Sequence, residues 1–179
     1  MSNPRGGGPR VHVSDDPRPE TLHYVEEARR LGTPNPDVYR VLEATPDLMR
    51  SFHAHWRDIF DGGIVDIELK ELVRRKMADV YGCATCRAAG IESQEPGDPK
   101  HNAAFDWRQS TDTLDDREQA ALWMAELLMG YETDADAVYR ELHERFSGPE
   151  IIELGWFIAF NVGTIQFVHS WRLHEEAPA

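Results

Sequence analysis

The sequence predicts an all-α protein, a single multi-helix domain of about seven or eight helices. Apolar residues recur at helical spacing in successive stretches, and no window shows the sustained alternation of polar and apolar residues that is typical of a half-buried strand. Proline, glycine and capping residues divide the chain into segments of helix length. With 179 residues, the chain is long enough for one domain with a sizeable core.

The first segment, residues 1–18, is rich in Gly, Pro, Ser and Arg and has almost no apolar side chains. Such a segment cannot bury enough apolar surface to offset the loss of chain entropy on ordering. We therefore expect a disordered N-terminal tail over residues 1–18 and a folded helical domain over residues 19–179.

Local start and stop signals place the helices in the first half of the domain. Gly32 is expected to end the first helix, because glycine readily adopts the left-handed conformation that stops one. Asn35 and Thr45 are expected to cap the next two helices, each of which has a proline in its first turn. The predicted helices cover residues 20–31, 37–43, 46–60 and 64–81, followed by a short helical run at the cysteines and a loop at residues 93–98.

Two capping boxes open helices in the second half. Asp115 and Ser147 are each followed three residues later by glutamate, which is the pattern of reciprocal capping at a helix start. The helix after Asp115 is apolar on nearly all sides and is expected to be buried. The helix after Ser147 is so apolar that it should pack between other helices or lie in a subunit interface. The predicted helices cover residues 116–129, 134–146 and 148–174.

Charge and hydropathy narrow the classes of partner. The net charge of −13 argues against a general nucleic-acid-binding protein, which would carry a basic patch. The N-terminus lacks the apolar segment of a signal peptide. The longest uncharged run, residues 154–168, is shorter and more polar than the ~20 apolar residues of a membrane span. A cytoplasmic protein with no nucleic-acid or membrane partner is the simplest interpretation.

The chain has two cysteines, Cys83 and Cys86, in a C-x-x-C arrangement that directly follows Gly82. We expect Gly82 to end one helix and Cys83 to begin another, with Cys86 in its first turn. The free N–H groups of a helix start, together with the positive charge of Arg87, would stabilise a thiolate there. Two thiols at this spacing can also form a disulfide, so one can resolve the oxidised form of the other. The charged residues of the preceding helix, Glu68, Lys70, Arg74 and Arg75, are expected to form a solvated face.

The two cysteines could also be zinc ligands or unreactive residues of the core. A structural zinc site needs four nitrogen or sulfur ligands, and the chain offers no second C-x-x-C and no suitably placed histidine pair. We therefore expect no metal and no cofactor. Two inert core cysteines are the plainer alternative, because free cysteine often behaves as a small apolar residue.

The order of several segments resembles the alkylhydroperoxidase D / carboxymuconolactone decarboxylase superfamily. Glu71 stands twelve residues before the cysteine motif Gly82-Cys83-Ala84-Thr85-Cys86. Supporting segments lie at residues 39–42 and 46–49 upstream and at residues 114–122 and 151–161 downstream. The resemblance covers residues 36–172, and the order of these segments is more specific than the C-x-x-C alone.

The resemblance implies an all-helical homo-oligomer (dimer, trimer or hexamer) that reduces peroxide at the expense of an external dithiol reductant. It makes Cys86 the peroxidatic cysteine, Cys83 the resolving cysteine and Glu71 the acid of a proton relay. The relay histidine expected four residues after the second cysteine is replaced here by Gly90. The histidines that could substitute for it are His101, His143 and His169.

Three functions remain open at this point. The first is a thiol-dependent (hydro)peroxidase or disulfide oxidoreductase of antioxidant type. The second is a small-molecule-binding or lyase-like relative, in which Trp107, Trp123, Trp156 and Trp171 would line an apolar cleft. The third is a redox-sensing oligomer without turnover.

Overall fold

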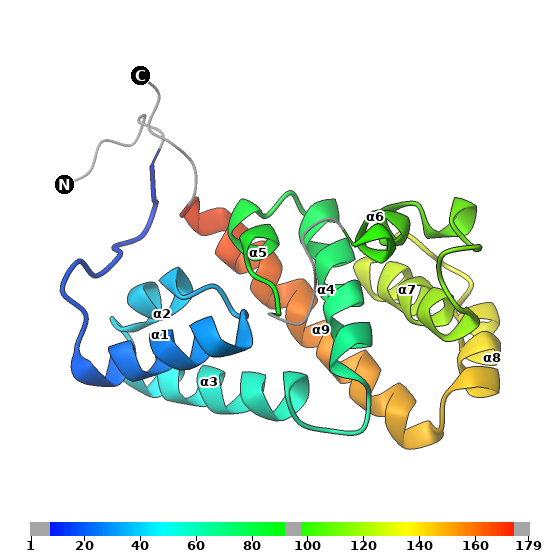
Figure 1. Ribbon diagram of the computed structural model, residues 1–179, viewed down its shortest axis with the longest axis horizontal. Helices are drawn as coiled ribbons and strands as arrows, with labels where there is room; N and C mark the ends of the chain where they lie inside the picture. The colour runs from blue at the N-terminus through cyan, green and yellow to red at the C-terminus, as the bar shows by residue number, and fades with distance from the viewer. Residues whose placement is uncertain (1–7, 92–97, 174–179) are drawn as a thin grey trace.

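The computed structural model describes residues 8–91 and 98–173, and within them it is all-helical, as the sequence predicts. The described part holds nine α-helices and one short 3₁₀-helix in one domain (Figure 1). Their bounds are α1 Pro19–Leu31, α2 Asp37–Leu42, α3 Pro46–Phe60, α4 Ile67–Val80, α5 Ala84–Ala88, α6 Pro99–Phe105, η1 Trp107–Gln109, α7 Asp116–Met129, α8 Ala135–Arg145 and α9 Gly148–Trp171.

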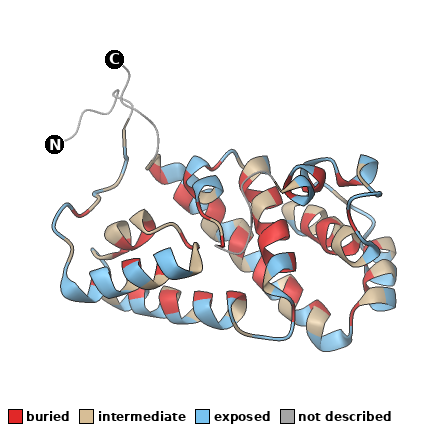
Figure 2. Cartoon of the chain, in the orientation of Figure 1, coloured by how far each residue is buried: buried red, intermediate tan, exposed pale blue. Residues whose placement is uncertain are grey.

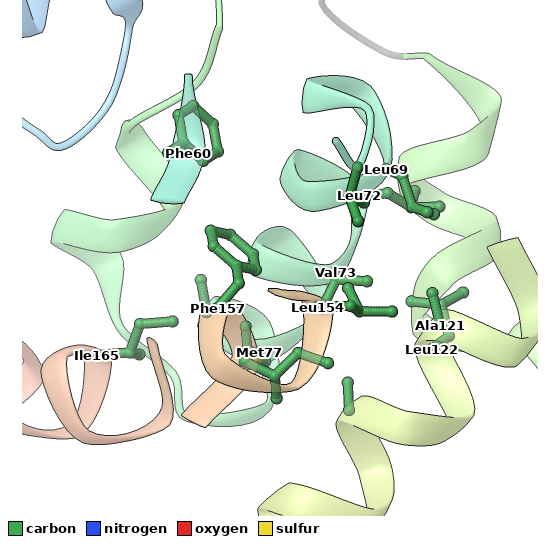
Figure 3. Close-up of a cluster of buried hydrophobic side chains, with 14 of the residues drawn as sticks. Phe60, Leu69, Leu72, Val73, Met77, Ala121, Leu122, Leu154, Phe157 and Ile165 are labelled. Atoms are coloured by element: carbon green, nitrogen blue, oxygen red, sulfur yellow. The ribbon is translucent and has the colours of Figure 1, made fainter. Parts of the chain in front are cut away.

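Two helices, α4 and α9, cross in the middle of the molecule and organise the rest (Figure 1). The first three helices pack on one side of this pair, and α7 and α8 pack on the other, while α9 contacts α3, α4, α5, α7 and α8. The core lies where α4, α7 and α9 meet, and Met77, Leu122, Leu154 and Phe157 converge there (Figure 3). Most of α4 is buried in consequence (Figure 2).

Most of the capping signals read from the sequence are present in the structure, and the one at Thr45 is not. Gly32 adopts a left-handed conformation at the end of α1, and Asp115 and Ser147 form capping boxes with the glutamates three residues later. Asn35 accepts a hydrogen bond from the Asp37 amide at the start of α2. Thr45 stands before α3, but its hydroxyl donates backwards to the Leu42 carbonyl and does not cap α3.

One helix, α6, was missed by the sequence prediction, although its start signal is visible. Asp98 accepts a hydrogen bond from the amide of Lys100, and Pro99 occupies the first helical position. In a second difference, α4 begins at Ile67 and not at residue 64, because the amides of Ile64 and Val65 donate to the Glu153 carboxylate of α9. The loop predicted over residues 93–98 lies almost wholly outside the described residues.

The predicted N-terminal tail falls partly in the described chain. Residues 1–7 lie outside it. Within residues 8–18, the Arg10 amide donates to the Trp171 carbonyl and the Ser14 amide donates to the Arg40 carbonyl. These hydrogen bonds join the segment to α9 and α2, and composition alone did not predict them.

By length and composition, α9 is the one described helix that could cross a membrane. Its residues Ile151, Leu154, Phe157 and Ile158 are buried against the rest of the domain, and a core helix meets the same two criteria.

Candidate functional site

The two cysteines lie at a break between helices. Gly82 has a φ of +63° just after α4, and Cys83 is the N-cap residue of α5. A disulfide joins Cys83 to Cys86, whose Cα atoms are 5.2 Å apart. The Cys86 amide donates to the Cys83 sulfur over 3.2 Å. The helix break that the sequence predicted at Gly82 is therefore present, and it places both sulfurs within one turn of chain.

The two sulfurs differ in their surroundings. Cys83 is fully buried, whereas Cys86 is half-buried. Cys86 lines a cavity of ≈ 40 Å³ together with Arg74, Asn161 and Thr164. A small molecule that entered this cavity would therefore meet Cys86.

Glu71 is completely buried, and its carboxylate accepts three hydrogen bonds from two guanidinium groups. Arg74 donates to both oxygens, from Nε over 2.6 Å and from Nη2 over 2.7 Å. Arg75 donates from Nε to Oε1 over 2.8 Å. Such charge-assisted hydrogen bonds are about twice as strong as neutral ones, so this cluster is held firmly. We call Glu71, Arg74 and Arg75 the arginine–glutamate cluster.

Arg74 joins this cluster to the cysteine segment. Its Nη1 donates to the Cys86 carbonyl over 2.6 Å, and its Nη2 donates to the Ala89 carbonyl over 2.8 Å. The structure thus brings Glu71 and the two cysteines together through Arg74. Two cations and one anion leave the cluster with one net positive charge beside Cys86, and positive charge favours a thiolate.

This arrangement corrects an expectation drawn from the sequence. Lys70 and Arg74 do not belong to a solvated face, because both are buried. Lys70 pairs with Glu153 over 2.6 Å, and Arg74 pairs with Glu71. The sequence did carry a signal of the ion pairs between Glu71 and the two arginines, because Glu71, Arg74 and Arg75 stand at i, i+3 and i+4 on one helix. Arg87, by contrast, is exposed and pairs with Asp79.

The space beside Gly90 is already filled. A Cβ atom at this position would overlap Nη2 of Arg75 and would lie 3.7 Å from Oε1 of Glu71. The Gly90 amide also donates to the Gly32 carbonyl over 2.6 Å. Arg75 therefore takes the place that a side chain at residue 90 would occupy.

Of the three candidate histidines, one lies near this cluster. His101 on α6 is 7% exposed, and its Nε2 has no hydrogen-bond partner among the described residues. Burial, and then the Arg75 charge, lower the pKa of His101, while Asp98 and Glu71 oppose this shift. His143 on α8 and His169 on α9 are exposed. His101 is thus a buried imidazole with an unused nitrogen.

An apolar groove adjoins the Cys86 cavity. It has a volume of ≈ 640 Å³ and lies between α2, α3 and α9. The groove and the Cys86 cavity share the residues Val38, Phe52, Thr164 and Val168. We call this hollow the α3–α9 groove. Trp171 is the one tryptophan of the predicted cleft that lines it.

Within residues 8–91 and 98–173, no group of three or more His, Cys, Asp or Glu side chains is arranged to hold a metal ion. Comparisons with protein-family models, curated proteins and solved structures find no match to this chain. The functional argument therefore rests on the site itself.

Proposed function

We propose that this protein is a thiol-dependent peroxidase or a related disulfide oxidoreductase whose reactive centre is the pair Cys83 and Cys86. One observation carries the proposal. The pair closes into a disulfide within one turn of chain, and the more exposed sulfur, Cys86, lines a cavity beside a buried cluster of net positive charge. A reactive dithiol needs these same features, namely access, a cation and a resolving partner.

The proposed reaction has three steps. The Cys86 thiolate attacks the O–O bond of a hydroperoxide, forming a sulfenic acid and releasing an alcohol, or water from hydrogen peroxide, after protonation. The Cys83 thiol displaces water from the sulfenic acid and forms the disulfide. An external dithiol then reduces this disulfide by exchange and is itself oxidised to a disulfide.

Glu71 has a particular part in this proposal. Its carboxylate is occupied by three guanidinium hydrogen bonds, so it orients Arg74 and Arg75 beside Cys86. His101 lies near the same cluster with an unused nitrogen, and its lowered pKa keeps the imidazole neutral near pH 7. We assign to His101, as the neutral base near this cluster, the uptake of the proton that Cys86 loses, while the guanidinium groups of Arg74 and Arg75 stay protonated.

The α3–α9 groove supports a substrate with an apolar body. Its lining is largely apolar, and it adjoins the cavity that holds Cys86. A hydroperoxide whose apolar part lies in the groove would direct its O–O group towards Cys86.

The test is peroxide consumption by the reduced protein with excess dithiol, in the wild type, in Cys86→Ser and in Cys83→Ser. We expect turnover in the wild type and none in Cys86→Ser. Cys83→Ser should react once and accumulate a sulfenic acid that dimedone traps. Full turnover in Cys86→Ser would refute the proposal, and oxidation of the wild-type thiols without turnover would indicate a redox sensor.

A second candidate function is a small-molecule-binding or lyase-like protein, and the α3–α9 groove is the observation that favours it. This candidate predicts that an apolar fluorescent ligand binds equally well to the wild type and to the double variant Cys83→Ser/Cys86→Ser. Loss of binding or of activity with the cysteines would favour the thiol reaction.

A further inference from the structure

The middle of α9 holds a buried polar side chain, Asn161, which is 1% exposed. The residues one turn before and after it, Phe157 and Ile165, are buried and apolar. The Asn161 Nδ2 donates to the Phe157 carbonyl over 2.8 Å, and within the described part of the chain its Oδ1 accepts no hydrogen bond. An acceptor that is buried without a donor lowers the stability of a fold. Asn161 therefore needs an explanation other than the packing of α9.

The side chain that carries this unused oxygen lines the Cys86 cavity. Asn161 borders the same hollow of ≈ 40 Å³ as Cys86 and Arg74. Cys86 comes from α5 and Asn161 from α9, and these two helices pack against each other (Figure 1). A hollow of about 10–15 Å³ is enough for one water molecule. The Cys86 cavity therefore has room for the two oxygens of a peroxide group.

From this placement we infer that the carboxamide oxygen of Asn161 binds the O–H group of the peroxide in the Cys86 cavity. The inference rests on the proposed function and adds a substrate-binding residue to it. An alkyl hydroperoxide has a single O–H donor, and a carboxamide oxygen is an acceptor only. Their hydrogen bond therefore selects which peroxide oxygen lies against Asn161, namely the one that carries the hydrogen.

Arg74 supplies a donor for the other peroxide oxygen. A guanidinium group has five N–H donors. Nε and Nη2 of Arg74 donate to Glu71, Nη2 donates also to the Ala89 carbonyl, and Nη1 donates to the Cys86 carbonyl. One N–H of Nη1 is therefore left without a hydrogen bond to the described residues. The cavity thus offers an acceptor and a donor to the two ends of one O–O bond.

This orientation determines which oxygen atom Cys86 receives. The Cys86 thiolate attacks the oxygen that Asn161 holds, so that an S–O bond forms while the O–O bond breaks. The electron pair of the O–O bond passes to the other oxygen, where the Arg74 N–H stabilises the developing negative charge. That oxygen then takes up the proton held by His101 and leaves as alcohol or water. The O–H bond at Asn161 stays intact and becomes the hydroxyl of the sulfenic acid.

Two substitutions remove the acceptor in different ways. Asn161→Leu keeps the branched shape of the side chain and has a larger volume, whereas Asn161→Ala enlarges the cavity. The matched control is Gln166→Leu, which removes an exposed carboxamide from the same helix and does not line the cavity. All the proteins carry Cys83→Ser, so that Cys86 is the one thiol of the chain. Circular dichroism confirms the folding of each variant, and Asn161→Ala gives the test if leucine disturbs the fold.

The experiment compares two reactions of the reduced Cys86 thiol, with hydrogen peroxide and with methyl methanethiosulfonate. The second reagent attacks the same thiolate but has no O–H or N–H group to donate. We expect both Asn161 variants to react about tenfold more slowly with peroxide, which corresponds to the loss of one hydrogen bond of ~1.4 kcal/mol. Their reaction with methyl methanethiosulfonate should change by less than about twofold, because no hydrogen bond to Asn161 is involved. The control Gln166→Leu should change neither rate.

The outcomes separate this inference from the function on which it rests. If peroxide oxidises the Cys83→Ser parent no faster than free cysteine, the proposed function fails and this inference fails with it. Fast oxidation that is unchanged in both Asn161 variants would overturn this inference alone and would leave Oδ1 as a site for water.

Two further outcomes would also overturn it. Equal slowing of both reactions would show that Asn161 acts on the thiolate and not on the peroxide. Slowing in Asn161→Leu without slowing in Asn161→Ala would show that leucine only fills the cavity.

Discussion

Four charged side chains of α4 are buried at the centre of this molecule, namely Lys70, Glu71, Arg74 and Lys76. Each of them has a partner of opposite charge, since Lys70 pairs with Glu153, Lys76 pairs with Glu126, and Glu71 pairs with Arg74. Burial of an ion is costly unless it is paired and hydrogen-bonded. Removal of one member of such a pair would therefore leave the other as an unpaired buried ion, which destabilises the fold.

At the residue scale, this dependence predicts the effect of removing the Glu71 charge. Glu71→Gln leaves the buried Arg74 without its anion, and loss of one member of a buried pair costs about 3–5 kcal/mol in the free energy of unfolding. The control is Glu68→Gln on the exposed side of the same helix, which should change it by less than about 0.5 kcal/mol. Urea unfolding measures both. Equal effects of the two substitutions would show that the buried charge has no special contribution.

At the element scale, α1 and the segment after α5 approach each other closely at two glycines. The Gly90 amide donates to the Gly32 carbonyl, and a Cβ atom on Gly32 would overlap the Gly90 carbonyl. This contact holds the end of α1 against the chain that leaves the cysteine site. Gly32 directly follows α1 and Gly90 lies two residues after α5, so neither can move without displacing a helix end.

This contact predicts different costs for alanine at two similar helix ends. Gly32 and Gly130 both end helices with positive φ, at +70° and +83°. Gly130→Ala meets no atom within 4 Å and should cost only the strain of the left-handed conformation, about 1–2 kcal/mol. Gly32→Ala adds a backbone overlap and should cost more than about 3 kcal/mol. Thermal unfolding of the two variants makes the comparison, and a smaller loss for Gly32→Ala would contradict the close approach.

At the scale of the whole molecule, two buried histidines lie in different helix groups. His53 lies on α3, where its Nδ1 shares a 2.8 Å hydrogen bond with the Tyr39 hydroxyl. His101 lies on α6. Burial lowers the pKa of His53, with Glu27 opposing the shift, and burial and Arg75 lower the pKa of His101.

These shifts predict how stability depends on pH. Because the folded pKa lies below the unfolded value of about 6.5, the unfolded chain binds protons first as the pH falls. The contribution of the two neutral histidines to the free energy of unfolding is therefore complete above about pH 6.5. Below this pH the free energy of unfolding falls, by up to about 2.7 kcal/mol per pH unit for the two groups together. Urea midpoints between pH 7.5 and 5.5 should show this fall. The variant His53→Gln/His101→Gln should show a flatter profile, and an equally steep profile would assign the dependence to other groups.

The sequence by itself determined the all-α class, the capped starts of α7 and α9, the end of α1 at Gly32 and the helix break at the cysteines. These features depend on neighbouring residues, because capping and glycine conformations act within one turn of chain. The start of α6 at Asp98 and Pro99 belongs with them, since its signal was local even though the prediction missed it.

Only the tertiary structure decided which charges are buried, what fills the space beside Gly90, and which face of α9 stays exposed. Arg74 looks like an ordinary surface residue in the sequence, and its burial follows from α5 and α6 packing on α4. The same holds for the burial of His101. Such properties arise from contacts between segments that are distant in the chain, where desolvation and pairing outweigh local preference.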